Sequence, residues 1–214
     1  MRNNYPISID LEGRRCCVVG GGTVAGRKVR SLLETGALIE VVSPRASEKI
    51  SAWANEGKIT WKRKPFDPGD LEGAFLVIGA TDQGGVNEQV FRAAREKGIL
   101  VNIADDPGMC NFFLPAVVHR GAFQVAVSTG GASPLLARRV REELEERYGA
   151  HFGEIAAQVA VIRKQLPDSV TDRRKRRVFW KQFIDLEYFR NLAGEDIAAC
   201  LKQRAAQCLS QLED

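Results

Sequence analysis

The stretch Arg15–Val29, RCCVVGGGTVAGRKV, constrains the fold more than any other part of the sequence. Its short apolar run predicts a buried strand, its three glycines a tight turn, and the remaining residues a helix. Gly20, Gly22 and Ala25 match the spacing G-x-G-x-x-G/A, whose small residues allow a turn, close approach of a pyrophosphate and helix packing. A glycine-rich turn that binds no ligand is the alternative interpretation.

The first hundred residues alternate short β-like runs with helical patterns, which predicts a parallel sheet covered by helices on both faces. The expected strands are Arg15–Val19, Ile39–Val42, Ile59–Lys62, Phe75–Ala80 and Ile99–Ala104. The expected helices are Val24–Thr35, Arg45–Asn55 and Gly85–Lys97, with Asp67–Leu71 as a turn or short helix. The runs CCVV and FLVIGA are apolar without alternation, which is typical of strands buried on both faces.

The alternation stops near Asn111. The segment from Phe112 to Pro134 predicts two strands around a turn at Arg120–Gly121, followed by a helix with Ser133 as its N-cap. The later helices are expected at His151–Lys164, Asp172–Tyr188 and Glu195–Leu212, with a break at Gln165–Ser169. These patterns predict an α/β chain with a Rossmann-type domain at 1–111, a small β insert and first helix at 112–147, and a helical domain at 148–214.

Composition fits an ordinary globular protein, with 44% hydrophobic and 27% charged residues among 214. No apolar run approaches a membrane span and the N-terminus lacks a secretory core, so we expect a cytoplasmic protein with no membrane partner. Five cysteines without CxxC spacing favour reduced thiols over disulfides or structural zinc. Basic clusters at Arg173–Arg177 and around Arg138 indicate either an anionic partner or solvated helix faces.

The second predicted strand ends without the acidic residue that usually binds the adenine ribose of a dinucleotide. Ser43, Pro44 and Arg45 occupy this position. The serine can still form a hydrogen bond with a ribose hydroxyl, and the arginine could accept a 2′-phosphate. The residues alone therefore leave NAD and NADP open.

The chain resembles the precorrin-2 dehydrogenases of sirohaem synthesis, a family that includes the N-terminal module of sirohaem synthases. Four segments carry the resemblance: VVGGGTVAGRKV, GATDQGGVNEQV, VNIADDPGMCNFFLPA and VAVSTGGASPLLARRVRE. The resemblance implies NAD-dependent oxidation of precorrin-2 to sirohydrochlorin, followed in some members by insertion of ferrous iron. It also implies NAD as cofactor and a homodimer formed through residues 112–147.

The resemblance places the family's essential aspartate at Asp105, directly after the fifth predicted strand. A carboxylate there could accept the proton that oxidation releases, whereas without the resemblance Asp105 and Asp106 are simple turn residues before a proline. Asp106 is expected to be a turn residue or a secondary contact. The predicted cofactor contacts are Gly20, Gly22, Thr23, Val24, Ala25, Ser43, Pro44, Arg45, Ala80, Thr81, Asn87 and Asn102.

A second glycine-rich loop, STGGASP, precedes the helix that carries Arg138 and Arg139. Because precorrin-2 carries eight carboxylates, backbone donors and cations there could bind it, although ordinary helix capping explains the loop equally well. The predicted substrate contacts are Ser128, Thr129, Gly130, Gly131, Ser133, Arg138 and Arg139.

No protein metal site is expected: His119 is a lone histidine, which is more often a surface or packing residue than a metal ligand, and the sequence offers no second ligand at metal-site spacing from Cys110. Two rival functions remain. One is a dehydrogenase that inserts no metal, and the other is a non-catalytic NAD-sensing module. A nucleic-acid-binding form of that module would use the basic run Arg173–Arg177, but it would leave Asp105 and the STGGASP loop unexplained, so we expect no nucleic-acid partner.

Overall fold

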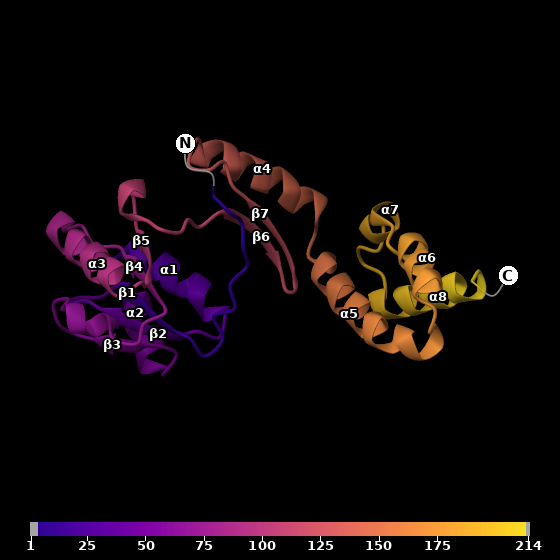
Figure 1. Cartoon of the computed structure of the whole chain (residues 1–214), viewed down its shortest axis with the longest axis horizontal. Helices are drawn as coiled ribbons and strands as arrows, with labels where there is room; N and C mark the ends of the chain where they lie inside the picture. Colours follow the sequence, from indigo (N-terminus) through magenta and orange to yellow (C-terminus); the bar gives the residue numbers. More distant parts are fainter. Residues whose placement is uncertain (1–3, 213–214) are drawn as a thin grey trace. The chain divides into compact units, whose positions relative to one another are not determined.

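The computed structural model describes residues 4–212, apart from the side chains of residues 167–169 (Figure 1). The chain forms two compact units. The first is Asn4–Leu114 and the second begins at Pro115. The predicted second boundary, between residues 147 and 148, stays a prediction.

The first unit contains a parallel sheet of five strands in the order β3-β2-β1-β4-β5. The strands are β1 Arg15–Val19, β2 Leu38–Val42, β3 Thr60–Lys62, β4 Leu76–Gly79 and β5 Leu100–Ile103. This topology confirms the predicted Rossmann-type fold. The strand order reverses at β1, and ligands of such sheets bind at the carboxyl ends of the strands beside that reversal.

Helices cover both faces of this sheet. Helices α1 (Thr23–Leu33) and α2 (Glu48–Asn55) pack on one face, while α3 (Gly84–Glu96) and the 3₁₀ helix η1 (Pro68–Leu71) pack on the other. Successive β1 residues point to opposite faces, since Val18 belongs to the α1 side and Val19 to the α3 side. Burial on both faces is the reason for the unbroken apolar runs in the sequence.

The second unit begins with the predicted hairpin. Strands β6 (Ala116–Arg120) and β7 (Phe123–Val127) pair antiparallel around Gly121, whose φ is +57°. Helix α4 (Pro134–Arg147) follows, and the Ser133 side chain accepts a hydrogen bond from the Leu136 N–H, as expected of an N-cap.

The remaining helices pack around the buried rings Phe179 and Phe183. They are α5 (His151–Ser169), α6 (Arg173–Phe183), α7 (Leu186–Arg190) and α8 (Ile197–Ser210), as Figure 1 shows. Across the described residues, no helix combines the length and the hydrophobicity that crossing a membrane requires.

Two helix predictions are wrong. Helix α5 continues through residues 165–169, where a break was expected, because Leu166 and Val170 are buried in the helical core. The single helix expected over Asp172–Tyr188 is instead α6 and α7, because the Asp185 side chain accepts hydrogen bonds from two backbone N–H groups and starts a new helix.

Candidate active site

A cavity of about 920 Å³ lies at the carboxyl ends of β1, β2, β4 and β5. The predicted residues that line it are Gly20, Gly22, Thr23, Val24, Ser43, Pro44, Arg45, Ala80, Thr81 and Asp105. The lining residues that were not among the predicted contacts include Gly21, Pro65, Phe66, Asp82, Gln83, Val86, Gln89 and Ala104. Ala25, Asn87 and Asn102 do not line the cavity.

The three glycines after β1 are required for different reasons. Gly20 has a φ of +124°, and a Cβ on it would overlap the Ala80 carbonyl. A Cβ on Gly21 would overlap the Arg45 carbonyl. A Cβ on Gly22 would meet no atom within 4 Å, although Gly22 lines the cavity. The folded chain itself therefore requires the first two glycines, whereas the fold does not require a glycine at position 22, and its cofactor role stays a prediction.

The start of α1 is suited to an anion. Its N-cap, Gly22, offers no side-chain cap, and the first turn contains no acidic residue. The first N–H groups of the helix and its partial positive charge are thus available to a pyrophosphate. Ala25, a residue of α1, is fully buried in the core between this helix and the sheet, as its motif position predicts. These features fit a dinucleotide.

The loop after β4 is held by a buried amide. Asn87 donates from Nδ2 to the Thr81 carbonyl at 3.0 Å, and its Oδ1 accepts from the Thr81 hydroxyl at 2.9 Å. Thr81 and Ala80 line the cavity. Asn87, predicted as a cofactor contact, instead fixes the backbone that borders the cavity.

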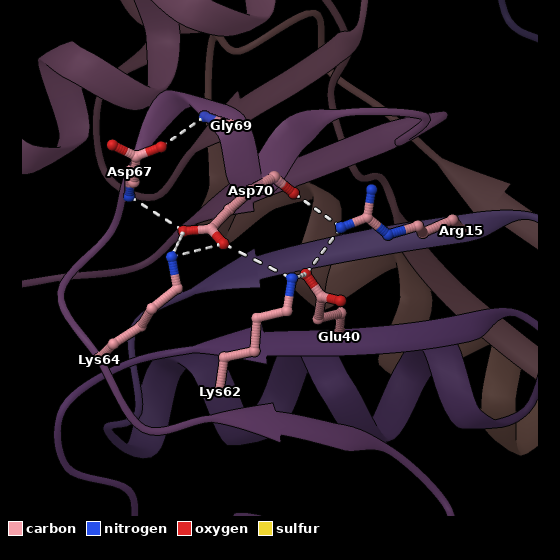
Figure 2. Close-up of polar contacts among 7 residues, drawn as sticks. All are labelled: Arg15, Glu40, Lys62, Lys64, Asp67, Gly69 and Asp70. Carbon is pink, nitrogen blue, oxygen red and sulfur yellow. Dashed lines mark hydrogen bonds and ion pairs between the residues drawn. The ribbon is translucent and has the colours of Figure 1, made fainter.

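The loop between β3 and η1 borders the cavity through Pro65 and Phe66. A charged network anchors it (Figure 2). Asp70, only 4% exposed, accepts hydrogen bonds from Lys64 Nζ at 2.8 Å and from the Asp67 N–H at 3.0 Å. Burial alone would raise the pKa of Asp70, but these two hydrogen bonds and the nearby lysines hold it below its ordinary value.

The network extends to the sheet. The Asp70 carbonyl accepts from Arg15 at 2.8 Å, and the same guanidinium contacts Glu40 at 2.8 Å. Lys62 bridges Glu40 at 2.9 Å and Asp70 at 3.5 Å. Figure 2 shows these side chains converging from β1, β2, β3 and η1.

Asp105 follows β5 at the edge of the cavity and is exposed. It is the one non-glycine residue with positive φ (+65°) in the part of the chain that the structure describes. Aspartate is among the side chains that tolerate this region best. Asp106 instead caps a 3₁₀ helix, η2 (Pro107–Met109), through hydrogen bonds from two N–H groups. The structure therefore gives the two neighbouring carboxylates different surroundings.

Asn102 and Cys110 fasten the segment that carries Asp105. Asn102 donates from Nδ2 to the Phe112 carbonyl at 3.0 Å. The buried Cys110 thiol donates to the Asp106 carbonyl at 3.1 Å and accepts from the Ile103 N–H at 3.3 Å. Asn102, predicted as a cofactor contact, therefore holds the turn rather than lining the cavity. No cluster of three or more His, Cys, Asp or Glu side chains suited to a metal ion occurs within residues 4–212.

Lys28 is a neighbour of Asp105 that the sequence did not indicate. Burial is the main cause that lowers the pKa of Lys28, with Arg27 adding to it, while the charge of Asp105 acts in the opposite direction. Lys28 follows Val24 by four residues, so it shares a helix face with this cavity-lining residue. That spacing was the available sequence signal.

The predicted substrate contacts lie in the second unit. The Ser128 hydroxyl accepts from the Gly130 N–H, and the Thr129 hydroxyl contacts both the N–H and the carbonyl of Ser133. Gly130 and Gly131 have φ values of +61° and +87°. The loop is thus built by local capping and left-handed glycines.

The two predicted arginines are exposed. Arg138 pairs with Glu142 at 2.9 Å and Arg139 pairs with the same carboxylate at 3.4 Å. These pairs are solvent-exposed, so they hold the guanidinium groups weakly. Their role in substrate binding stays a prediction.

Known proteins resemble this chain along its length. A family model described as "Putative NAD(P)-binding" matches residues 7–116, and one described as "Sirohaem biosynthesis protein central" matches residues 120–147. The siroheme synthase of Nitrosococcus oceani is 42% identical over 84% of this chain and 38% of its own length. That of Citrobacter koseri is 38% identical over 98% of this chain and 46% of its own. The chain thus spans less than half of these relatives.

A solved structure is similar over the full length. SirC, a precorrin-2 dehydrogenase, is 30% identical to this chain and superposes with a TM-score of 0.75. The superposition covers 98% of this chain and 99% of SirC. Its likeness extends over both units, and the family models match the dinucleotide-binding fold and the hairpin-α4 region separately. The chain therefore belongs to the family of NAD(P)-binding sirohaem-biosynthesis proteins that contains precorrin-2 dehydrogenase.

Proposed function

We propose that this protein is a precorrin-2 dehydrogenase, which oxidises precorrin-2 to sirohydrochlorin with NAD. The observation that carries the proposal is the open glycine loop at the start of α1, in one cavity with Asp105. Full-length similarity to a precorrin-2 dehydrogenase supports the substrate.

Different residues would bind the cofactor, accept the proton and hold the loops in place. NAD, when bound, would supply the hydride acceptor for the oxidation. The loop from Gly20 to Gly22 and the first N–H groups of α1 would hold its pyrophosphate. Asp105 accepts the proton released in the same oxidation, so that two electrons and two protons leave precorrin-2 in total. Asn87, Asn102 and Cys110 hold the loops that position these groups.

The substrate contacts belong to the proposal as well. The STGGASP loop together with Arg138 and Arg139 would supply N–H donors and cations for the eight carboxylates of the macrocycle. Ferrous iron insertion is the finer part of the proposal. The tetrapyrrole nitrogens would bind the metal and Asp105 would take up the pyrrole protons.

A direct assay tests the main claim. Purified protein given NAD and precorrin-2 without oxygen should yield NADH and sirohydrochlorin in equal amounts, and omission of NAD should abolish both. NAD binding without any turnover would instead support the NAD-sensing module. Adding ferrous iron to sirohydrochlorin then tests metal insertion separately.

A further inference from the structure

The cavity has an uneven distribution of charge. Its two acidic lining residues, Asp82 and Asp105, follow β4 and β5. The lining residues that follow β2 and β3 are Ser43, Pro44, Arg45, Pro65 and Phe66, and they include no carboxylate. Because β2 and β4 flank β1 on opposite sides, the acids and Arg45 belong to opposite ends of the site.

The end of β2 is the position at which dinucleotide folds distinguish their cofactors. An acidic side chain there binds the ribose 2′-hydroxyl of NAD, and it would repel the 2′-phosphate of NADP. Here Ser43 stands at this position, 9% exposed. Its hydroxyl donates to the Arg45 carbonyl at 2.6 Å, so only its lone pairs remain for a ribose hydroxyl. Ser43 therefore accepts a ribose hydroxyl without adding negative charge.

The backbone of Arg45 is tightly placed. The Ser43 hydroxyl donates to the Arg45 carbonyl, and Gly21 lies against the same carbonyl. Two residues further along the chain, the Ser47 N–H donates to the Gly21 carbonyl at 2.8 Å. The Arg45 side chain, in contrast, is exposed and lines the cavity. A guanidinium on a fixed backbone at this place is suited to bind a phosphate with two hydrogen bonds.

A second arginine nearby is already engaged. The Arg63 guanidinium stacks over the Trp61 ring at 4.2 Å from its centroid, and Trp61 Nε1 donates to the Ser43 carbonyl at 3.0 Å. Arg63 does not line the cavity. It adds positive potential near Ser43 and serves as a matched control for Arg45.

We propose that the site also accepts NADP, with Arg45 as the counter-cation of the 2′-phosphate, so that either dinucleotide can support the oxidation. This inference rests on the proposed dinucleotide site. It requires that a 2′-phosphate meet Arg45 and that no carboxylate oppose it, and both conditions follow from the residues after β2.

Calorimetric titration of the full chain with NAD⁺ and with NADP⁺ tests the proposal without any tetrapyrrole. In the wild type the two dissociation constants should lie within about tenfold of each other. Arg45→Gln should lower the preference for NADP⁺ over NAD⁺ by roughly tenfold to a hundredfold, the value of a charge-assisted hydrogen-bonded pair. Ser43→Asp should lower it further by placing a carboxylate beside the phosphate.

The control is Arg63→Gln. It should change both dissociation constants by less than about twofold, because Arg63 does not line the cavity and only a distant, salt-screened charge is lost. NADP⁺ binding more than about 100-fold weaker than NAD⁺ in the wild type would overturn the proposal. An equal loss of affinity for both cofactors in Arg45→Gln would also overturn the proposal. Because Arg45 is exposed, Arg45→Gln should fold, so it tests the proposal even if Ser43→Asp does not fold. Binding of NAD⁺ alone would leave the proposed dehydrogenase intact, whereas binding of neither would remove the dinucleotide site itself.

Discussion

A side chain at Gly21 should disturb the fold, whereas a side chain at Gly22 should disturb only the binding of a ligand. Gly22→Asp should keep the fold, since its Cβ meets no atom within 4 Å. It should weaken NAD binding by at least about 100-fold, because a carboxylate beside the pyrophosphate costs several kcal/mol. Gly21→Ala should instead lower the free energy of unfolding by about 3 kcal/mol, because its Cβ overlaps the Arg45 carbonyl. Thermal unfolding and NAD titration of both variants separate the two effects, and wild-type NAD affinity in Gly22→Asp would refute the cofactor role of this loop.

Asp105 and Asp106 provide a second matched pair. Asp105→Asn keeps size and still tolerates a positive φ, but it accepts no proton, so oxidation of precorrin-2 should fall by roughly 10²–10⁴-fold. NAD affinity should stay unchanged, as measured by titration. Asp106→Asn should have little effect, because an amide oxygen can still cap η2.

Iron insertion distinguishes the roles of Asp105 further. If the wild type inserts ferrous iron into supplied sirohydrochlorin, Asp105→Asn should slow that reaction too. Unchanged insertion would show that the carboxylate serves oxidation alone. Near-normal oxidation in Asp105→Asn would refute its assignment as the proton acceptor.

Some residues of the candidate site could be predicted from the sequence, and others could not. Gly20 and Gly22 could be found from spacing, because the motif itself encodes a turn and a phosphate approach. Gly21 and Phe66 could not, because their roles depend on contacts with segments distant in sequence. Lys28 shares a helix face with Val24, but only the folded chain shows that it lies near Asp105. The sequence indicated that Asn87 belongs to the site but not what its side chain does, since only the folded loop shows that its amide donates to the Thr81 carbonyl.

At the scale of elements, the β3–η1 loop depends on the charge of Asp70. The pKa of Asp70 is lowered in the fold, so its contribution to stability is present above its ordinary value of 3.8 and is lost as pH falls through the lower folded value. The wild-type melting temperature should therefore drop below about pH 4. Asp70→Asn should remove this part of the pH dependence, and Asp70→Ala should cost about 3 kcal/mol at neutral pH.

An exposed ion pair between Glu72, which follows η1, and Lys97, which follows α3, is the control. Glu72 contacts Lys97 at 2.9 Å but is 82% exposed, so Glu72→Gln should leave the melting temperature and its pH dependence unchanged. Circular dichroism melts between pH 3 and pH 7 would measure both variants. An identical pH profile in Asp70→Asn and the wild type would contradict the role of the network.

The elements themselves show which patterns are decisive. Strands of the sheet were predictable because burial on both faces leaves continuous apolar runs. The break expected at residues 165–169 failed because burial of Leu166 and Val170 outweighs a local helix-breaking signal. The split between α6 and α7 was missed because Asp185 acts as a cap inside an otherwise helical pattern.

At the scale of the whole molecule, the hairpin-α4 region leaves apolar side chains uncovered. Leu135 is 65% exposed, Leu136 is 56% exposed and Val117 is 36% exposed. Two short strands are marginally stable alone, and the burial of such side chains is typical of an interface between subunits. We propose a symmetric homodimer formed through this region.

Sedimentation equilibrium tests the dimer at micromolar concentration, where the wild type should have twice the 23.6 kDa mass of the chain. Leu136→Glu should shift the protein toward the monomer, because a carboxylate would be buried without a partner on both sides of a two-fold axis. Val161→Glu is the matched control: Val161 is 46% exposed but belongs to α5 rather than to β6, β7 or α4, so this substitution should leave the mass unchanged. A wild type that sediments as a strict monomer would refute the dimer, and dissociation by both substitutions alike would refute this surface as its interface.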